Sequence, residues 1–388
     1  MTMADVADAA DALPDAYRLE NADTHLTPAP HVLAATRDAV GVDEYNSYLP
    51  LRGLARLRQA ISDRYRADWG IRYDPDSEIV VSSGAGESLL NALLALIDPG
   101  DRVLLTNPTY SGMAQRVRLA GGAQAFVGLV RRGGRWELDL DRLPAAAQGC
   151  RVLFLASPCM PTGTVFSREE TEAIAAVAQA NDAWIVFNGH ADKVVFGGRK
   201  VICPATLAGL RERTVLVGCV SKNFGMPGWR VGWELGPRKV MAAMEDVHIF
   251  NGVMPSGFGQ VGAAAALSGP QDWQREAVAT YERGQAVLLE QVHRSPVLAA
   301  VPAEGGYYCL LDVAGTGTDA VTFARGLLAG HRVAVTPMQG WGSDDFGEHL
   351  VRLIFTNEPE DRLREAGRRI AAFADGLAGG SSPNPWSV

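Results

Sequence analysis

Nearly continuous apolar runs alternate with amphipathic stretches along the first two thirds of the chain. Six of these runs have the length and composition of strands, at 78–83, 102–107, 123–129, 151–157, 183–188 and 213–221. Several contain almost no polar residue, which is typical of parallel strands buried on both faces. The stretches between them predict helices at 54–68, 86–97, 111–120, 168–180 and 237–248. This alternation predicts a large three-layer α/β domain around a mostly parallel sheet.

The pattern changes near residue 268, where a long helical run begins. It is followed by "GGYYCLLDV", a helix near 320–330, a strand within "EHLVRLIFT" and a final helix from 359. This order predicts a smaller α+β domain, and 388 residues are too many for one simple core. We therefore expect five parts: a loose leader at 1–16, an N-terminal segment at 17–45 that joins the small domain, a large domain at 46–267, a small domain at 268–375 and a tail at 376–388.

The composition argues against several classes of protein. The formal net charge is -8 and basic residues form no long run, so we expect no nucleic-acid partner. No stretch of roughly 18 uninterrupted apolar residues is present, so we expect no membrane span. The acidic N-terminus lacks the features of a signal peptide, and the five cysteines are scattered without a C-x-x-C pair. We expect a cytoplasmic protein with reduced thiols and no metal site.

Polar and glycine-rich motifs come directly after the predicted strands. They are "SSGAG", "NPTY", "SPCMPTG", "NGHAD" and "SKNFG". Ligands of parallel sheets bind beyond the carboxyl ends of the strands, so these motifs should meet in one site. "SSGAG" leads into a helix, where backbone N–H groups and the helix dipole can bind a phosphate, although an ordinary tight turn has the same pattern.

Lys222 and Arg230 are the two residues of the last motif that carry chemistry. A lysine at the end of a buried strand is costly to desolvate, and burial makes its amine a nucleophile toward carbonyl groups. Arg230 can bind a phosphate through its planar guanidinium. Taken alone, the two residues would be better explained as a surface lysine in a loop and a structural arginine.

The segment "SKNFGMPGWRVGW" at 221–233 resembles the lysine signature of fold type I pyridoxal 5′-phosphate (PLP) enzymes, specifically the class I and II aminotransferases. Further parts of that family's pattern follow in its order: "YLPLRGLARLRQAI", "VVSSGAGESLLNALLALIDPGDRVLLTNPTY", "SPCMPTG", "EGGYYCLLDV" and "HLVRLIFTN". The resemblance spans roughly residues 17–375. It implies a PLP-transferase fold of type I, PLP as cofactor, an α-amino acid substrate, and a homodimer with shared active sites.

The resemblance also implies roles for individual cofactor-binding residues. Lys222 would hold the cofactor as a Schiff base and later move protons at the substrate carbon. Tyr110 would stack on the pyridine ring. The phosphate would be bound by Arg230, Ser221 and the N–H groups of Ala85 and Gly86, with Tyr48 reaching the phosphate of the neighbouring subunit.

Three residues are candidates for substrate binding. Arg352 would pair with the substrate α-carboxylate, for which its bidentate geometry is suited; the alternative is a salt bridge at a strand edge. Asn21 and His25 lie where the family places a segment that covers the substrate, and they would equally suit a turn.

The sequence departs from the family pattern around the cofactor ring. Asn188 replaces the aspartate that pairs with the pyridine nitrogen, while Met160 and Ala191 replace an asparagine and a tyrosine that donate to the phenolic oxygen. A carboxylate stabilises a protonated nitrogen and an amide does so only weakly, so the ring should be a poorer electron sink. His190 and Asp192 lie near enough to replace the lost contacts.

These departures leave several interpretations open. The first is an aminotransferase-like enzyme, with a specialised reaction in secondary metabolism. The second is a PLP enzyme that catalyses β- or γ-elimination or replacement, decarboxylation with oxidative deamination, or carbon–carbon bond formation. The third is a non-catalytic binding protein, although retention of Lys222, Arg230 and Arg352 argues against it. The fourth is that Asn188 is an engineered change.

Overall fold

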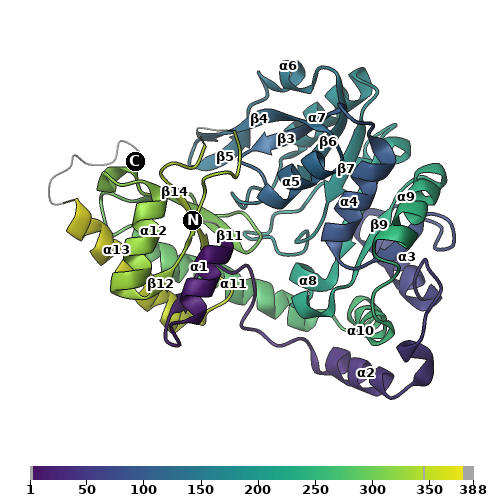
Figure 1. Ribbon diagram of the computed structural model, residues 1–388, viewed down its shortest axis with the longest axis horizontal. Helices are drawn as coiled ribbons and strands as arrows, with labels where there is room; N and C mark the ends of the chain where they lie inside the picture. Colours follow the sequence, from purple (N-terminus) through teal and green to yellow (C-terminus); the bar gives the residue numbers. More distant parts are fainter. Residues whose placement is uncertain (1–2, 344–345, 379–388) are drawn as a thin grey trace.

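The computed structural model describes residues 3–343 and 346–378. Its larger domain contains an eight-stranded sheet in the order β2-β9-β8-β7-β6-β3-β4-β5 (Figure 1). The strands are β2 (Ile79–Ser82), β3 (Arg102–Asn107), β4 (Ala123–Arg132), β5 (Arg135–Leu138), β6 (Cys150–Ala156), β7 (Trp184–Asn188), β8 (Thr214–Cys219) and β9 (Gly232–Leu235). The central pairs from β4 to β8 are parallel, and the pairs that involve β2, β5 and β9 are antiparallel. The predicted α/β fold with a mostly parallel sheet is therefore confirmed.

Helices cover both faces of this sheet. They are α2 (Pro30–Val40), α3 (Ala55–Trp69), α4 (Ala85–Leu96), α5 (Ser111–Leu119), α6 (Leu143–Ala147), α7 (Arg168–Ala180), α8 (Val220–Asn223), α9 (Arg238–Asn251) and α10 (Gly257–Ser268). Alternate strand residues point to opposite faces, so Val152 belongs to a core shared with residues of α4, α5 and α9, while its neighbour Leu153 belongs to a core shared with residues of α3, α7 and α10. The two resulting cores make the domain three-layered, as the alternation of elements predicts.

The smaller domain has an antiparallel sheet in the order β10-β11-β14-β13. Its strands are β10 (Ala299–Ala300), β11 (Tyr308–Asp312), β13 (Thr336–Pro337) and β14 (Leu350–Ile354), and its helices are α11 (Asp272–Val292), α12 (Ala320–His331) and α13 (Glu360–Leu377). A separate apolar core joins the helices to the sheet. Strands β11 and β14 are neighbours, and Leu310 pairs with Arg352. Tyr308 therefore lies on β11 two residues from the partner of Arg352.

Five 3-10 helices connect these elements among the described residues. They are η1 (Asp43–Asn46), η2 (Pro204–Thr206), η3 (Arg211–Arg213), η4 (Pro227–Trp229) and η5 (Ala314–Thr316). No helix in this part of the chain combines the length and apolar character that crossing a membrane requires.

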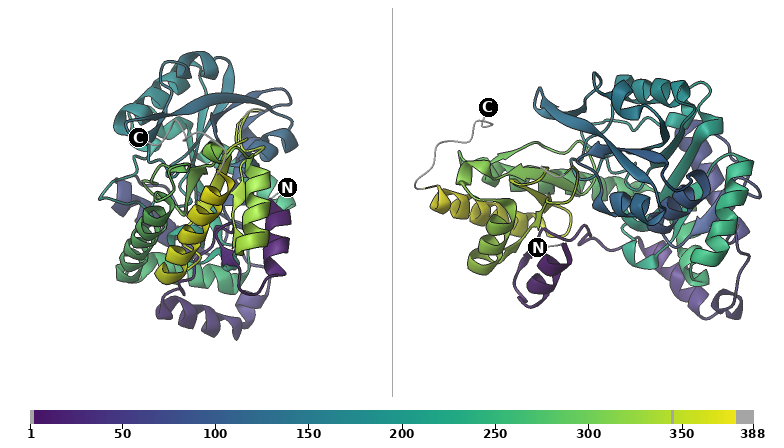
Figure 2. Two further views of the ribbon diagram at one scale, coloured as in Figure 1. Left: turned by 90° about the vertical axis from the view of Figure 1, so that its left-hand side faces the viewer. Right: turned by 45° about the horizontal axis from the view of Figure 1, so that its top comes forward.

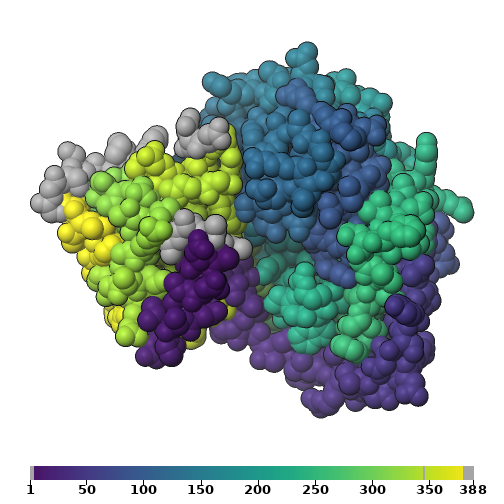
Figure 3. Space-filling view, in the orientation of Figure 1, coloured from purple at the N-terminus to yellow at the C-terminus, as the bar shows by residue number. Residues whose placement is uncertain are grey.

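The N-terminal segment links the two domains, which lie side by side (Figures 1 and 2). Residues 3–11, expected as part of a loose leader, form helix α1 (Met3–Asp11), and Val6 and Ala10 pack against the small domain. Strand β1 (Tyr17–Arg18) then pairs in parallel with β12 (Val333–Ala334). The chain continues along the large domain, where it forms the purple strip beneath that domain (Figure 3), and α2 packs against α10. Most of the predicted tail, from 379 onward, lies outside the described residues.

Candidate active site

A cavity of about 250 Å³, the central cavity, lies where the carboxyl ends of β3, β6, β7 and β8 meet the small domain. It brings together the candidate residues of the sequence analysis except Tyr48, His25, Ala191 and Asp192. Its lining residues are Asn21, Ala22, Ala85, Gly86, Leu89, Tyr110, Ala156, Met160, Asn188, His190, Cys219, Ser221, Lys222, Arg230, Trp341 and Arg352. The motifs that follow separate strands therefore meet in one place, as expected for a parallel sheet.

One end of the central cavity is suited to an anion. Helix α4 begins at Ala85, and its N-cap residue Gly84 provides no side chain to bind the free N–H groups of the first turn. The Arg230 guanidinium lies against Gly84, because an added Cβ there would come within 2.7 Å of Arg230 Nη2. Ser221 lines the same cavity. A helix N-terminus, a guanidinium and a hydroxyl group together can bind a phosphate.

Lys222 contributes an amine to the middle of the central cavity. It lies in the short helix α8, directly after β8, and its side chain is half-buried. Nζ donates a hydrogen bond to the carbonyl oxygen of Ala22 and lies 5.0 Å from the centre of the Tyr307 ring. Burial lowers the pKa of Lys222 to about 8, despite the opposing influence of Asp23. A substantial fraction of this amine is therefore neutral, and nucleophilic, at mildly alkaline pH.

Arg352 provides a second cation on the small-domain side of the cavity. Its side chain is only 1% exposed, and Nη2 donates to Glu20 O at 2.7 Å and to Thr336 Oγ1 at 3.3 Å. Burial lowers its pKa to about 10, so the guanidinium still carries its charge at neutral pH. A buried guanidinium that borders a cavity is suited to a carboxylate ligand.

Trp341 forms a wall of the central cavity that the sequence analysis missed. The Arg352 guanidinium lies 4.8 Å from the centre of its ring, and Tyr110, from the large domain, lies 6.4 Å from it. Thr109 N donates to Trp341 O at 2.8 Å, and Asn107 Nδ2 donates to Ser343 Oγ at 2.8 Å, so this loop is bound to the large domain. An aromatic residue in a glycine-rich loop ahead of the Arg352 strand was the available signal.

Asn188 and His190 line a wall that contains unpartnered polar atoms. Asn188 is 5% exposed and its Oδ1 accepts no hydrogen bond from the described residues. His190 is 8% exposed, and its Nε2 lies 2.9 Å from Tyr308 Oη. Asp192, the other residue near enough in sequence to help, instead accepts a hydrogen bond from Asn223 at 2.6 Å and does not line the cavity. Ala191 is buried in the small-domain core.

Tyr48 and His25 lie outside the central cavity of this chain. Tyr48 is 88% exposed and borders an open surface hollow formed with the loop at 252–256. His25 is exposed, and its Nδ1 lies 2.9 Å from the carbonyl oxygen of Thr356. Tyr48 is therefore available to contact another molecule. The position of His25 agrees with the alternative interpretation of this residue as part of a turn.

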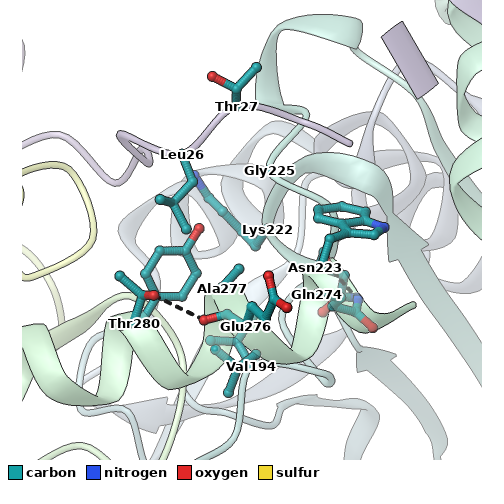
Figure 4. Close-up of a pocket in the computed structure, with 13 residues that line it drawn as sticks. Leu26, Thr27, Val194, Lys222, Asn223, Gly225, Gln274, Glu276, Ala277 and Thr280 are labelled. Atoms are coloured by element: carbon teal, nitrogen blue, oxygen red, sulfur yellow. Dashed lines mark hydrogen bonds between the residues drawn. The ribbon is translucent and has the colours of Figure 1, made fainter. Parts of the chain in front are cut away.

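A second cavity of about 250 Å³, the side cavity, adjoins Lys222 from another direction (Figure 4). It lies between Leu26 and Thr27 of the N-terminal segment and the first turns of α11, including Gln274. The segment at 21–27 borders both cavities, with Ala22 on the central one. This segment therefore lies across the amine and narrows access to it.

Comparison with known proteins agrees with this geometry. The family model described as "Aminotransferase class I and II" matches residues 16–370. An aspartate aminotransferase of Rhizobium meliloti is 30% identical over 364 residues, which cover 90% of this chain and 86% of that protein. An arginine–pyruvate transaminase of Pseudomonas aeruginosa is 32% identical, covering 91% of this chain and 88% of the relative.

Solved structures show the same architecture. The N-succinyldiaminopimelate aminotransferase of Mycobacterium tuberculosis superimposes with a TM-score of 0.91 at 30% identity, covering 96% of each chain. An aspartate aminotransferase of Thermus thermophilus, solved with maleate, gives a TM-score of 0.88 at 29% identity, again covering 96% of each chain. The similarity therefore includes both domains.

Proposed function

Since this chain belongs to the aminotransferase class I and II family and is a PLP-dependent aminotransferase, we propose that its central cavity performs amino transfer on an α-amino acid, with Lys222 as the reactive amine. The observation that carries the proposal is the arrangement of three groups around one cavity. They are the amine of Lys222, the anion-binding N-terminus of α4 beside Arg230, and the guanidinium of Arg352.

The residues of the central cavity fit the cofactor. The uncapped N-terminus of α4, with Arg230 and Ser221, suits the phosphate. Asn188 Oδ1 is buried without a partner, and buried polar atoms are rarely left so unless a ligand supplies one. The Tyr110 ring borders the same space and suits an aromatic ligand.

Each group of the protein has a separate task in this proposal. When bound, PLP supplies a carbonyl group that condenses with amines and a conjugated ring that accepts electrons from the substrate carbon. The neutral amine of Lys222 would hold the cofactor, and when free it would be placed to take a proton from the substrate carbon and to return one. Arg352 binds the α-carboxylate and fixes the orientation of the substrate.

Asn188 changes the electrostatics of the site without abolishing its fit. An amide carries no charge, so it stabilises a protonated pyridine nitrogen less than a carboxylate would. The charged side chains that line the cavity within the described part of the chain are Lys222, Arg230 and Arg352, which are all cations. A further positive charge is therefore poorly stabilised in this space.

The comparisons do not favour the other interpretations. The named relatives are aminotransferases, which argues against elimination, decarboxylation or bond formation as the main reaction and against a non-catalytic protein. Direct formation of a new amino acid from a 2-oxo acid acceptor, such as pyruvate or 2-oxoglutarate, is the assay that separates amino transfer from release of ammonia.

We further propose that the enzyme is a homodimer with two-fold symmetry whose active sites are shared. Tyr48 and Phe250 are 88% and 90% exposed, and Leu51 and Val253 are also exposed. Large apolar side chains in such numbers on one region suit a surface that another subunit covers. Tyr48 is the residue that would then reach the phosphate site of the neighbouring subunit.

The substitution Lys222→Ala tests the proposed function. We expect it to abolish both amino transfer and the visible absorption of bound PLP, because the amine that attaches the cofactor is removed. Lys200→Ala, which removes an exposed lysine, is the control and should change neither. Unchanged turnover in Lys222→Ala would refute a role for this amine.

A further inference from the structure

His190 and Tyr308 form a buried pair across the two domains. His190 follows β7 of the large domain, and Tyr308 begins β11 of the small domain. Their exposed fractions are 8% and 1%, and His190 Nε2 lies 2.9 Å from Tyr308 Oη. Burial of two polar side chains at this contact requires a satisfied hydrogen bond between them.

The surroundings of Tyr308 indicate whether its Oη or His190 Nε2 carries the hydrogen of this hydrogen bond. Among the described residues, His190 Nε2 is the hydrogen-bond partner found for the Tyr308 hydroxyl group. Burial raises the pKa of Tyr308 far above its usual value, so the phenol keeps its proton. With no other acceptor found for it among the described residues, the hydroxyl group is suited to donate a hydrogen bond to Nε2. His190 is itself neutral, because burial and the charge of Lys222 lower its pKa to about 4. A neutral imidazole that accepts at Nε2 carries its hydrogen on Nδ1.

His190 lines the central cavity on the same wall as Asn188. Its Nδ1 makes no hydrogen bond of ordinary geometry to the described residues, and the backbone of Asn188 only partly offsets the lowering of the ring's pKa by burial. Asn188 Oδ1 is also buried and unpartnered. Two buried polar atoms without partners on one wall indicate that a ligand completes their hydrogen bonds.

We propose that His190 is a further active-site residue, a neutral imidazole fixed by Tyr308 as the Nδ1–H tautomer, which together with Asn188 supplies the polar contacts to the cofactor ring. His190 replaces the hydrogen-bond donors that the family pattern has at the positions of Met160 and Ala191. Tyr308 is the residue that positions the His190 ring. The inference rests on the proposed binding of PLP in the central cavity.

The charges around the pair support this assignment. Lys222 faces His190 from α8, and Arg352 acts on Tyr308 from β14. Both are cations, and no carboxylate lines the central cavity within the described ranges. A protonated imidazole would add a further positive charge to this space, whereas a neutral Nδ1–H donates a hydrogen bond without one. Because Tyr308 belongs to the small domain, the tautomer depends on the two domains being docked.

Nitrogen NMR of the protein labelled with ¹⁵N in its histidine rings tests the tautomer directly. The signal of His190 is assigned by its loss in His190→Asn. We expect a protonated Nδ1 and an unprotonated Nε2, with the Nδ1 resonance shifting when PLP is added. His248, whose Nδ1 lies 2.5 Å from Glu87, is a buried internal control that should stay unchanged. A protonated Nε2, or an Nδ1 resonance that PLP leaves unchanged, would overturn the proposal.

Three substitutions of His190 separate its two nitrogens. Asn places a polar group near the position of Nδ1, Gln near that of Nε2, and Leu removes both. Titrating apoenzyme with PLP, we expect His190→Asn to stay within about threefold of wild type and Gln and Leu to weaken binding about tenfold, as loss of one buried hydrogen bond does. Equal affinities for the Asn, Gln and Leu variants would contradict a contact through Nδ1.

Tyr308→Phe tests the positioning role, with Tyr73→Phe as its matched control. Both remove the hydroxyl group of a buried tyrosine, but the hydroxyl group of Tyr73 has no partner among the described residues. We expect Tyr308→Phe alone to change the tautomer of His190 and to shift the pH midpoint of the cofactor's visible absorption. Identical midpoints and tautomers in the two variants would show that Tyr308 is merely structural.

Borohydride treatment of wild-type holoenzyme distinguishes failure of this inference from failure of the proposed function. If Lys222 becomes covalently labelled while the His190 variants behave as wild type, only the role of His190 is wrong. If Lys222 remains unlabelled, the proposed function fails, and the inference fails with it.

Discussion

Lys222 combines chemical reactivity with a thermodynamic penalty. Its amine is half-buried, and burial lowers its pKa from 10.5 to about 8. The same loss of water that makes the neutral amine available as a nucleophile therefore makes the charged form unfavourable in the folded protein. Function at this position is expected to reduce the stability of the cofactor-free enzyme, as is common where an active site holds a desolvated group.

The stability of Lys222→Met without cofactor measures this penalty. The folded-state pKa lies below the unfolded one, so the unfolded chain binds the proton more tightly between pH 8 and 10.5. The penalty is complete below about pH 8 and disappears as the pH rises past 10.5. At pH 7 we expect the variant to be more stable by up to about 3 kcal/mol in urea unfolding.

The advantage of Lys222→Met should shrink steadily when the same unfolding experiment is repeated at increasing pH. Lys200→Met, at an exposed position, provides the control and should show little difference at any pH. A stability gain that does not depend on pH would mean that better packing of methionine, and not the charge, is responsible.

At the scale of elements, the anion-binding end depends on the backbone before α4. Gly84 has φ 89°, a conformation that residues with a Cβ rarely adopt, and its missing side chain leaves room for Arg230. Gly232 also allows β9 to lie close to this backbone, since a Cβ there would lie 2.5 Å from the Gly84 carbonyl carbon. Strand β9 can therefore bring the residues of the lysine motif directly against the N-terminus of α4.

Gly84→Ala should displace the Arg230 guanidinium and weaken the binding of PLP, or of inorganic phosphate, to apoenzyme by about tenfold or more, since a charge-assisted contact is lost. Gly70→Ala is the control. Gly70 also has a positive φ, of 69°, but nothing lies within 4 Å of its added Cβ. Both substitutions should reduce stability, and only Gly84→Ala should reduce affinity in equilibrium titrations. Equal affinities would show that Arg230 has another route to the phosphate.

The elements that the sequence analysis missed have a common physical reason. The predicted strands correspond to β2, β3, β4, β6, β7 and β8, but the sequence pattern predicts no helix in the glycine-rich segment "FNGVMPSGFGQ" at 250–260, whereas α10 begins within it at Gly257. Glycine disfavours helices locally. Here close packing overrides that preference, because a Cβ at Gly257 would lie 2.4 Å from Tyr45 O and one at Gly262 2.2 Å from Thr36 Oγ1.

At the scale of the whole molecule, the central cavity exists only because three parts of the chain meet. The large domain supplies Lys222 and Arg230, the small domain supplies Arg352 and Trp341, and the N-terminal segment supplies Asn21. The hydrogen bond from Thr109 N to Trp341 O links the two domains beside the cavity. Substrate binding and domain docking are therefore expected to depend on each other.

The proposed exchange of Tyr48 between subunits predicts complementation. In a dimer of one Lys222→Ala chain and one Tyr48→Ala chain, one site combines both substitutions and the other contains neither. Random mixing makes half of the dimers mixed, so we expect about a quarter of wild-type activity to return. Each variant alone, taken through the same unfolding and refolding, is the control. No recovery in dimers shown by mass spectrometry to be mixed would contradict the shared site.

The linear order of residues was sufficient for the local features of this protein. Apolar runs and turn residues identify the strands, and the motif around Lys222 identifies the amine and its phosphate-binding arginine, because these features depend on neighbours in the chain. The contacts of Trp341 with Tyr110 and of His190 with Tyr308 could not be found that way. They join residues more than a hundred positions apart, and only the docking of the two domains, with its burial of apolar surface, brings them within reach of each other.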